Sequence, residues 1–239
     1  MNTGVSIEYA ENEYGKVFHI SEVKYRAGYR CIECKQALFP RLGDIRAHHF
    51  AHYPYLNPCI LSNPESALHF NVKMLIYSML KSAPTPLFKR MLFGRFTCEY
   101  CGKYRDEFVW KIAEGWTNVY YEYRVGGNQA DVVLLDGDSC ILAIEVCNTN
   151  PKKDKEINNY KSSGVPMLEV DANEILSVGW EYPQWIPVKL LVPPPFKDGR
   201  SFHRECHIKH RGLVTVEVVD LRDKLAVNRV VNRMFPNVI

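Results

Sequence analysis

The sequence predicts a mixed α/β fold with a metal-binding module at its N-terminus, and three observations lead to this prediction. Cysteine and histidine gather in the first sixty residues, a long helical pattern starts at residue 64, and residues 117–171 follow the order strand, strand, strand, helix, strand. Consecutive strands give antiparallel pairs, whereas a strand that follows a helix can pair in parallel, so the expected sheet is mixed.

The bulk composition indicates a folded protein rather than a disordered or membrane-spanning one. The chain has 239 residues, of which 46% are hydrophobic, and a formal net charge of +3, so it can bury a core. Apolar runs stay below the roughly 18 residues that cross a bilayer, and the opening MNTGVSIEYAENEYG has no signal-peptide pattern. We therefore expect a cytoplasmic protein with no membrane partner. Its eight cysteines are then metal ligands or free thiols rather than disulfides.

Charge and loop-forming residues divide the chain into three predicted regions. They are a zinc-binding module at 1–60, a core at 61–178 and a basic extension at 179–239. Residues 186–239 hold ten Lys and Arg against five Asp and Glu. Such an excess fits a polyanion partner such as nucleic acid, although ordinary solvated surfaces show it as well.

The segment CIECKQALFPRLGDIRAHHFAH places a Cys-x-x-Cys pair ahead of three histidines. Thiolates and imidazoles in this arrangement suit tetrahedral Zn²⁺, and a site closed by four protein ligands is structural. The predicted ligands are Cys31, Cys34, His49 and His52. The histidine spacing leaves His48 open as an alternative, and Cys59 can displace one histidine.

A second Cys-x-x-Cys pair, Cys98 and Cys101, lacks a partner pair nearby in the sequence. The segment FHRECHIKH at 202–210 offers two more cysteine or histidine ligands from far along the chain. We therefore consider a second zinc site, with a turn that carries two ordinary thiols as the alternative.

The helical pattern has a clear start and a clear end. Asn63 is the expected N-cap and Pro64 the first helical residue, and the helix ends before SAPTP at 82–86. Glu65, His69 and Lys73 recur every four residues and so share one face. By itself, such a stripe is more often a solvated surface than a site.

The segment ADVVLLDGDSCILAIEV at 130–146 predicts a β-hairpin with one acid near each outer end, Asp131 and Glu145. Neither strand alternates cleanly, so a central hairpin covered on both faces is expected. A two-residue turn places the acids on opposite faces, whereas a three-residue loop places them on the same face. On one face they suit a shared Mg²⁺; otherwise they are solvent-facing acids.

The chain contains, in order, Cys-x-x-Cys, HFAH (49–52), ESALHFNVK (65–73), QADVV, AIEV and GVPMLEVD (164–171). This series resembles the CoiA-like competence family, regarded as a branch of the PD-(D/E)XK nuclease superfamily with an N-terminal zinc-binding segment. The resemblance runs from about residue 20 to about residue 175. It implies a restriction-endonuclease-like mixed sheet flanked by helices, with the nuclease core at 61–178, and metal-dependent cleavage of DNA.

The resemblance also implies roles for particular residues. Asp131 and Glu145 match the two metal-binding carboxylates, and Glu65 matches the acid that the first core helix supplies, with His69 beside it. The expected ion is Mg²⁺ or Mn²⁺, and endonuclease and exonuclease activity both remain open.

The chain departs from the Glu-x-Lys pattern, because Cys147 stands where the superfamily has its lysine. A thiol cannot supply a fixed cation beside the attacked phosphate. Lys155, on the following helix, or Lys73, on the first helix, is expected to reach the site instead. Glu122 is a candidate for a further acid near the metal.

The expected partner is DNA, in single-stranded, duplex or branched form. The predicted phosphate contacts are Arg200, Arg204, Lys209 and Arg211. Tyr25, Tyr29 and Tyr104 are candidates for stacking on unpaired bases. The alternative is a catalytically inactive nuclease-fold module that binds nucleic acid or a protein partner. A homodimer or a recombination or defence protein partner fits either function.

Overall fold

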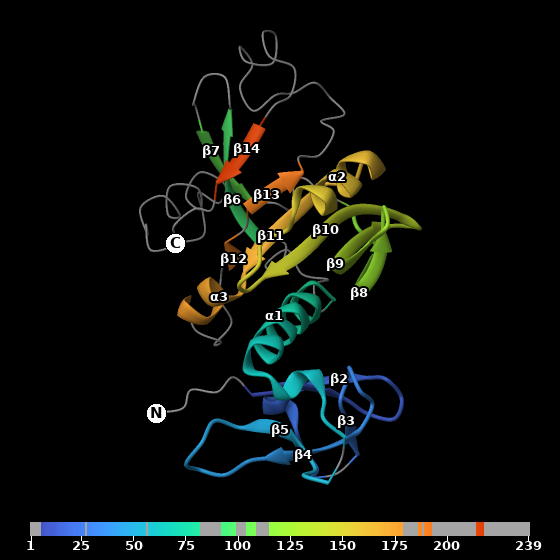
Figure 1. The fold of residues 1–239 in the computed structure, drawn as a ribbon, viewed down its shortest axis with the longest axis vertical. Coiled ribbons are helices and arrows are strands. Elements are labelled where there is room, and N and C mark those ends of the chain that lie inside the picture. The colour runs from blue at the N-terminus through green and yellow to red at the C-terminus, as the bar shows by residue number, and fades with distance from the viewer. Residues whose placement is uncertain are drawn as a thin grey trace, which may run out of the picture. The chain divides into compact units, whose positions relative to one another are not determined.

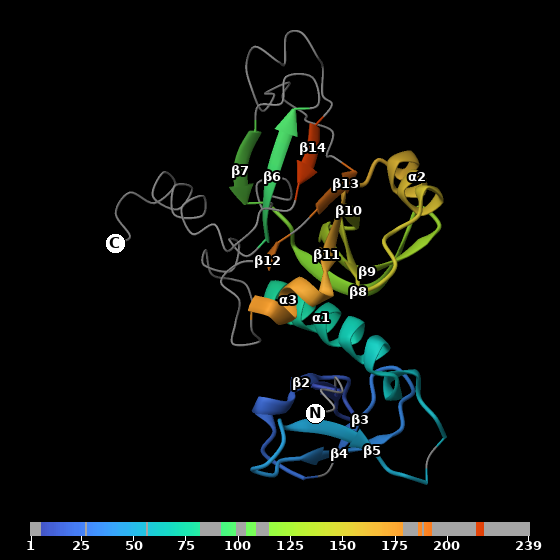
Figure 2. The same cartoon turned by 60° about the vertical axis from the view of Figure 1, so that its left-hand side comes forward.

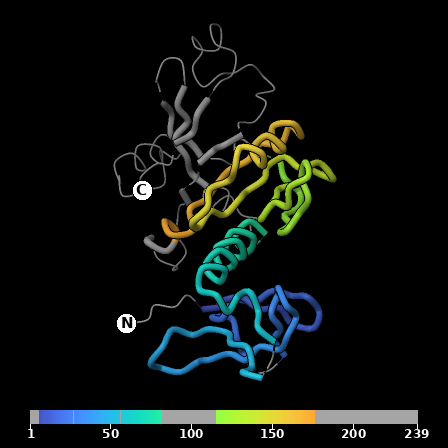
Figure 3. Tube along the Cα trace, viewed as in Figure 1, coloured from blue at the N-terminus to red at the C-terminus, as the bar shows by residue number. Residues whose placement is uncertain are grey.

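The structure is a computed structural model that describes most of the chain up to residue 178 and short strands beyond it (Figure 3). The described ranges are 6–26, 28–55, 57–81, 92–98, 104–108, 115–178, 186–187, 189–192 and 214–217. The chain divides into two compact units, Met1–Leu75 and Ile76–Ile239. Over the described ranges, no helix has the length and apolar character to span a membrane.

The first unit is built on a five-stranded antiparallel sheet in the order β2-β1-β3-β4-β5 (Figure 1). Its elements are β1 (Tyr9–Glu11), β2 (Val17–His19), η1 (Ile20–Glu22), β3 (Tyr29–Arg30), β4 (Ala37–Arg41), β5 (His49–His52) and η2 (Ile60–Ser62). An isolated bridge between Ile7 and Phe50 ties the start of the described chain to β5. The core beneath the sheet contains Tyr9, Tyr29 and Leu38.

Helix α1 (Pro64–Lys81) confirms the predicted helix and both of its ends. The Asn63 side chain accepts a hydrogen bond from the Glu65 backbone N–H at 2.8 Å, as expected of an N-cap. The boundary between the two units falls inside α1. Within the first unit, Asn71 is fully buried. Its side-chain amide donates to the Ser6 carbonyl and accepts a hydrogen bond from the Glu8 N–H, which ties α1 to the segment that leads into β1.

The second unit contains a five-stranded mixed sheet in the order β13-β11-β10-β9-β8 (Figures 1 and 2). Its elements are β8 (Asn118–Val125), β9 (Asn128–Asp136), β10 (Ser139–Cys147), α2 (Asp154–Ser163), β11 (Met167–Asp171), α3 (Ala172–Val178) and β13 (Lys189–Val192). The β10·β11 pair is parallel and the other pairs are antiparallel. The predicted order of three strands, a helix and a strand is confirmed, and the fold is mixed α/β.

Helix α2 covers one face of this sheet, as both views show (Figures 1 and 2). Tyr160 of α2 is fully buried and packs with Val133, Ala143 and Met167 in one apolar cluster. These three residues lie side by side on neighbouring strands, since Ala143 pairs with Val133 on one side and with Met167 on the other. These three positions therefore mark the face of the sheet that α2 covers, and every second residue along each strand lies on the same face.

A smaller sheet in the second unit is formed by the strands β6, β7, β12 and β14. Their bounds are β6 (Leu92–Cys98), β7 (Tyr104–Phe108), β12 (Ile186–Pro187) and β14 (Val214–Glu217). The sequence predicts strands within FTCEYCGKYRDEFVW (96–110) and in LVTVEVVD (213–220), and strands are present in part of each segment. The sequence also predicts a short helix near AVNRVVNRMF (226–235), which lies outside the described residues.

Candidate functional site

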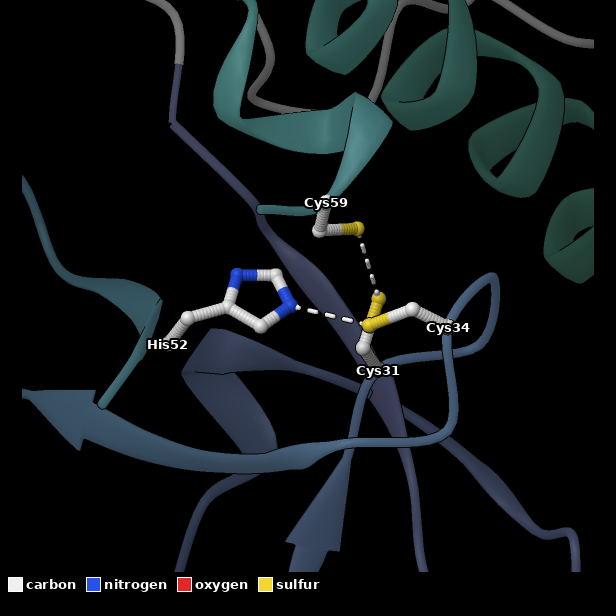
Figure 4. A group of neighbouring side chains, drawn as sticks. All are labelled: Cys31, Cys34, His52 and Cys59. Carbon is white, nitrogen blue, oxygen red and sulfur yellow. Dashed lines mark hydrogen bonds between the residues drawn. The ribbon is translucent and has the colours of Figure 1, made fainter. Parts of the chain in front are cut away.

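Four side chains of the first unit converge on one point (Figure 4). They are Cys31, Cys34, His52 and Cys59, whose ligand atoms all lie within 4.8 Å of one another. The Sγ atoms of Cys31 and Cys59 are 3.8 Å apart, and Cys34 Sγ lies 3.2 Å from His52 Nε2. The cysteines are free thiols. We call this group the Cys/His cluster.

A tight turn between β3 and β4 presents the first two thiols. The Lys35 N–H donates to the Cys31 carbonyl at 2.9 Å, and the Cys31 N–H donates to the Gln36 carbonyl at 2.8 Å. Lys35 has φ of +61°, a left-handed conformation in which a non-glycine residue is strained. Its ammonium pairs with Glu11 at 2.7 Å, which anchors the turn to β1.

The other two ligands come from later elements. His52 ends β5 and Cys59 directly precedes η2. Burial raises the pKa of Cys31, and the nearby Cys59 thiol adds to the shift. Burial likewise raises the pKa of Cys59 and lowers the pKa of His52. The imidazole is therefore neutral, which is the ligand form, and a bound cation would have to favour the thiolates.

The donor set fits a tetrahedral Zn²⁺. Three thiols and one imidazole make a closed four-ligand site of the structural kind. With Zn–S bonds of about 2.3 Å, neighbouring sulfurs in a tetrahedron lie about 3.8 Å apart, which agrees with the separation of Cys31 and Cys59. The cluster can therefore hold a metal such as zinc.

His49 is not part of the cluster, so its prediction as a ligand is wrong there. Its Nδ1–H donates instead to the Ala47 carbonyl at 2.8 Å. Residues three apart in a strand point to opposite faces of the sheet, and His52 takes the face that meets the thiols. Cys59, the alternative that the sequence left open, supplies the fourth ligand, while His48 is exposed.

The second predicted zinc site falls mostly outside the described residues. Cys101 lies there, as does the segment 202–210, and only the backbone of Cys98 is described, at the end of β6. The predicted phosphate contacts Arg200, Arg204, Lys209 and Arg211 also lie outside the described residues. Both remain predictions.

The hairpin between β9 and β10 brings the two predicted acids to one face by an unexpected route. Its turn has two residues, because Asp136 pairs with Ser139, and this register alone would oppose Glu145 to Ala130. An irregularity between Cys140 and Leu142 then shifts the pairing by one residue, so that Ile144 pairs with Val132. One further step along this register places Glu145 across from Asp131, on the α2 face.

The sheet is irregular around Asp131. The regular pairing with β10 stops at Val132, and the Asp131 side chain accepts the Val146 N–H at 2.8 Å in place of a backbone carbonyl. On the other side, the register places Glu122 of β8 beside Asp131, between two regular pairs. Glu122 has φ of +53°, and backbone strain of this kind is concentrated at functional sites.

Glu145 is surrounded by polar groups although it is only 1% exposed. The buried Tyr160 hydroxyl donates to its Oε1, and the Lys152 ammonium lies 2.9 Å from its Oε2. Burial and the charge of Asp131 raise the pKa of Glu145 to about 7. Burial lowers the pKa of Lys152, but the charges of Glu145 and Asp131 outweigh burial and the net shift is upward.

Sequence reasoning missed Lys152 and Glu169. Glu169 pairs in register with Glu145 on the parallel strand β11, is 6% exposed, and accepts the Lys152 N–H at 2.9 Å. It thereby positions the segment that carries Lys152. The signal for Glu169 was present in the sequence, since a lone acid interrupts the apolar strand PMLEV just as Asp131 and Glu145 interrupt theirs. We call Asp131, Glu145 and Glu169 the acid row.

The other predicted site residues lie as follows. Glu65 is exposed in the first turn of α1, and His69 is half-buried one turn later. That these two residues act together with Asp131 and Glu145 remains a prediction. Lys155 is exposed on α2, whereas Lys73 is 4% exposed and pairs with Glu33 at 3.6 Å within the first unit.

Comparison with known proteins bears on the Cys/His cluster. Residues 15–60 match the family model of the competence protein CoiA, N-terminal domain, and this range contains all four residues of the cluster. No curated protein and no solved structure matches the chain. Over residues 15–60 the chain is therefore similar to the CoiA N-terminal domain, and the Cys/His cluster lies inside the matched range.

Proposed function

We propose that this protein is a metal-dependent deoxyribonuclease with a restriction-endonuclease-like core. Asp131 and Glu145 bind Mg²⁺ or Mn²⁺ in this proposal. The ion would lower the pKa of a bound water and stabilise charge on the leaving oxygen of a phosphodiester. The Cys/His cluster holds a structural zinc and takes no part in the chemistry.

The observation that carries the proposal is the placement of two buried acids side by side. Asp131 is 7% exposed and Glu145 is 1% exposed, and the charge of one raises the pKa of the other. Burying two like charges together is costly, and the β-bulge in β10 that aligns them is of the kind found next to active sites. A divalent cation would relieve their repulsion.

One further feature fits this ion. Glu145 Oε2 is buried and receives no hydrogen bond among the described residues, because the Lys152 ammonium approaches it as an ion pair without hydrogen-bond geometry. Carboxylate oxygens are the ligands that Mg²⁺ prefers. Among the described residues, only the Cys/His cluster gathers three or more Cys, His, Asp or Glu ligand atoms within 4.8 Å. The proposed ion therefore depends on the carboxylate pair, with water at the remaining positions.

Lys152 replaces Lys155 and Lys73 as the best candidate for the cation that Cys147 cannot supply. Its ammonium lies beside the carboxylate that would bind the ion, and its side chain is 23% exposed, so it can meet a phosphate. When a metal takes over part of the charge of Glu145, the ammonium can turn to a phosphate oxygen and stabilise its developing charge. Tyr160 holds Glu145 in place through its hydroxyl.

The second candidate function is a binding module that keeps this fold without cleavage. It is favoured by the contacts of Glu145, whose two oxygens already meet Tyr160 and Lys152 inside the protein. A carboxylate satisfied in this way can serve the core of the second unit alone.

Cleavage assays with purified, zinc-loaded protein test the proposal. Supercoiled plasmid and labelled single-stranded, duplex and branched oligonucleotides are incubated with Mg²⁺, Mn²⁺ or neither. Asp131→Asn and Glu145→Gln keep the size of each side chain and an acceptor oxygen, so the Val146 N–H and the Tyr160 hydroxyl retain their partners. Asp138→Asn, in the exposed turn of the same hairpin, is the matched control.

The proposal predicts cleavage that requires the divalent ion, disappears in both site variants and persists in the control. DNA binding by the wild type and both variants, with no cleavage of any substrate, supports the binding module instead. Cleavage that survives in Asp131→Asn would contradict the assignment of the metal site.

A further inference from the structure

The first unit has an open pocket of about 930 Å³ lined by aromatic rings and cations. Phe18, Tyr25 and Tyr53 contribute rings to its wall, and Tyr14 stands at the same pocket. Tyr25 is 75% exposed and Tyr14 is 84% exposed. Such rings bury little area within the first unit, so their placement calls for an explanation other than core packing.

The rings continue beyond the pocket as a row of tilted ring contacts. Tyr53 lies 4.9 Å from Phe39 and 5.6 Å from Tyr55, measured between ring centroids. Tyr55 ends this row and is 79% exposed. Tyr53 belongs to both groups, so the pocket and the row meet at this residue. We call the pocket and the row together the ring surface.

Cations are placed among these rings. Lys16 Nζ lies 4.9 Å above the Phe18 ring, and the Arg41 guanidinium lies 5.2 Å above the Phe39 ring. Lys24 and Arg30 also line the pocket, and all four cations are exposed. The pocket wall includes two acids, Glu13 and Glu22. In the pocket wall, the three cations Lys16, Lys24 and Arg30 exceed these acids by one.

We infer that the ring surface binds single-stranded nucleic acid. Exposed rings offer stacking platforms for unpaired bases, and cations between them contact the phosphates that connect those bases. A duplex keeps its bases stacked on one another and cannot use the rings. Tyr29, a stacking candidate from the sequence, is only 7% exposed and belongs to the core instead.

The inference concerns binding alone and uses residues of the first unit only. That the bound strand is also the strand to be cut rests on the proposed function. The test must therefore separate binding from cleavage, and the full chain carrying Asp131→Asn serves as the binding protein throughout.

Fluorescence anisotropy with a labelled oligothymidylate of about 16 nucleotides measures the affinity. Tyr25→Ser with Tyr55→Ser removes two exposed rings, and Tyr25→Phe with Tyr55→Phe keeps the rings and removes the hydroxyls. Tyr120→Ser is the matched control, since Tyr120 is an exposed tyrosine on β8 of the second unit. A duplex of the same length and an oligouridylate compete for the site.

We expect the serine pair to weaken binding by about tenfold per ring, while the phenylalanine pair and Tyr120→Ser bind as the parent does. Both single-stranded competitors should displace the probe better than the duplex. Equal affinity of the serine pair and the parent would overturn the inference. So would preference for the duplex, or an equal loss in the phenylalanine pair.

The cations have a separate signature in the salt dependence. Lys24→Gln with Arg30→Gln should lower the slope of log K against log salt by about 0.7 for each phosphate that the variant no longer neutralises. Lys161→Gln, an exposed lysine of α2, should leave the slope unchanged. An unchanged slope in the first pair overturns the role of these cations at the phosphates. If ring-dependent binding is found and wild-type protein cuts nothing, the inference stands and the proposed nuclease fails.

Discussion

The Cys/His cluster and the acid row differ in what already surrounds their ligand atoms. In the cluster, Cys31 faces Cys59 and Cys34 faces His52, and burial raises the pKa of the two buried thiols. In the acid row, the protein supplies its own cation and hydroxyl, since Lys152 and Tyr160 both contact Glu145. One site brings together groups that need a cation, whereas the other is largely compensated without one.

This difference indicates two kinds of metal dependence. Thiols that converge without a compensating charge can be stabilised as thiolates by a metal such as zinc, so we expect metal binding and folding of the first unit to be coupled. A carboxylate pair that Lys152 already stabilises lets the second unit fold in the absence of the ion. The Mg²⁺ that we propose for this pair would then be free to exchange, and we expect the loss of each metal to have different consequences.

The largest effect is expected at the cluster. Cys31→Ala and His52→Ala should each abolish zinc binding there and with it the cooperative folding of the first unit, because zinc-finger peptides gain about 10–16 kcal/mol from their metal. Zinc content by mass spectrometry and backbone amide spectra measure both effects. The signals of the second unit should persist.

Two matched variants sharpen this prediction. His49→Ala should retain zinc, because His49 points away from the cluster and donates to Ala47. Cys140→Ala removes a free thiol of the second unit and should leave the zinc content unchanged. If His49→Ala lost zinc and His52→Ala kept it, the assignment of the cluster would be wrong.

How much of the fold the sequence could predict depends on whether the signal for an element is local or comes from distant segments. Helix α1 was predicted from end to end because its signals are local, namely Asn63 as cap, Pro64 at the first position and a proline-containing segment after it. The order of strands before and after α2 was predicted for the same reason, because these elements follow one another directly along the chain. The pairing of β13 beside β11 and the composition of the smaller sheet depend on contacts between distant segments, which local patterns do not encode.

The candidate sites follow the same rule. Three of the four cluster ligands could be predicted because they lie within 22 residues of one another, and only the fourth was ambiguous. In the acid row, the sequence identified Asp131 and Glu145 but could not show that both lie on one face of the sheet. That placement depends on the bulge after Cys140, for which no residue in the turn gives a signal. Lys152 reaches Glu145 only in the folded chain, where its backbone N–H binds Glu169 on a later strand and its ammonium meets Glu145.

The next largest effect concerns the cation of the acid row. Lys152→Met should reduce cleavage by about 10²–10³-fold, the usual cost of removing one group that stabilises developing charge. Lys155→Met is the matched control, because Lys155 is an exposed lysine three residues further along. Single-turnover rates and binding of the same oligonucleotide separate loss of chemistry from loss of affinity. Equal loss in both variants would contradict the role of Lys152.

A smaller effect is expected in the pH dependence of stability. The pKa of Glu145 rises from 4.5 to about 7 in the folded protein, so the folded state holds a proton that the unfolded chain releases. The stabilisation that this proton brings is complete below about pH 4.5 and is lost as the pH rises through 7. Glu145→Gln is uncharged at every pH and should lack this loss.

Thermal unfolding without divalent ions measures this difference. Between pH 5 and 8, the melting temperature of the wild type should fall by a few degrees relative to Glu145→Gln. Asp138→Asn, in the exposed turn of the hairpin, should follow the wild type. Added Mg²⁺ should raise the melting temperature of the wild type and of this control, but not that of Glu145→Gln. If the melting temperatures of wild type and Glu145→Gln changed with pH in parallel, ionisation of Glu145 would not destabilise the folded protein.

The smallest effects concern the backbone. In the described part of the chain, Lys35 and Glu122 are the two non-glycine residues with positive φ. One follows Cys34 of the cluster, and the other lies across from Asp131 of the acid row. Replacing either by glycine relieves about 1 kcal/mol of strain, which the greater entropy of glycine in the unfolded chain partly offsets.

The two glycine variants should differ in function. Lys35→Gly also loses the partly exposed ion pair with Glu11, worth about 0–1 kcal/mol. It should therefore keep its zinc and nearly its wild-type stability. Lys35→Ala loses the same ion pair but keeps the backbone strain, so it should be slightly less stable than Lys35→Gly. Glu122→Gly should gain stability in urea titrations yet lose cleavage, because the strained residue fixes the strand beside Asp131. Undiminished cleavage in Glu122→Gly would show that this strain, like that of Lys35, belongs to the fold alone.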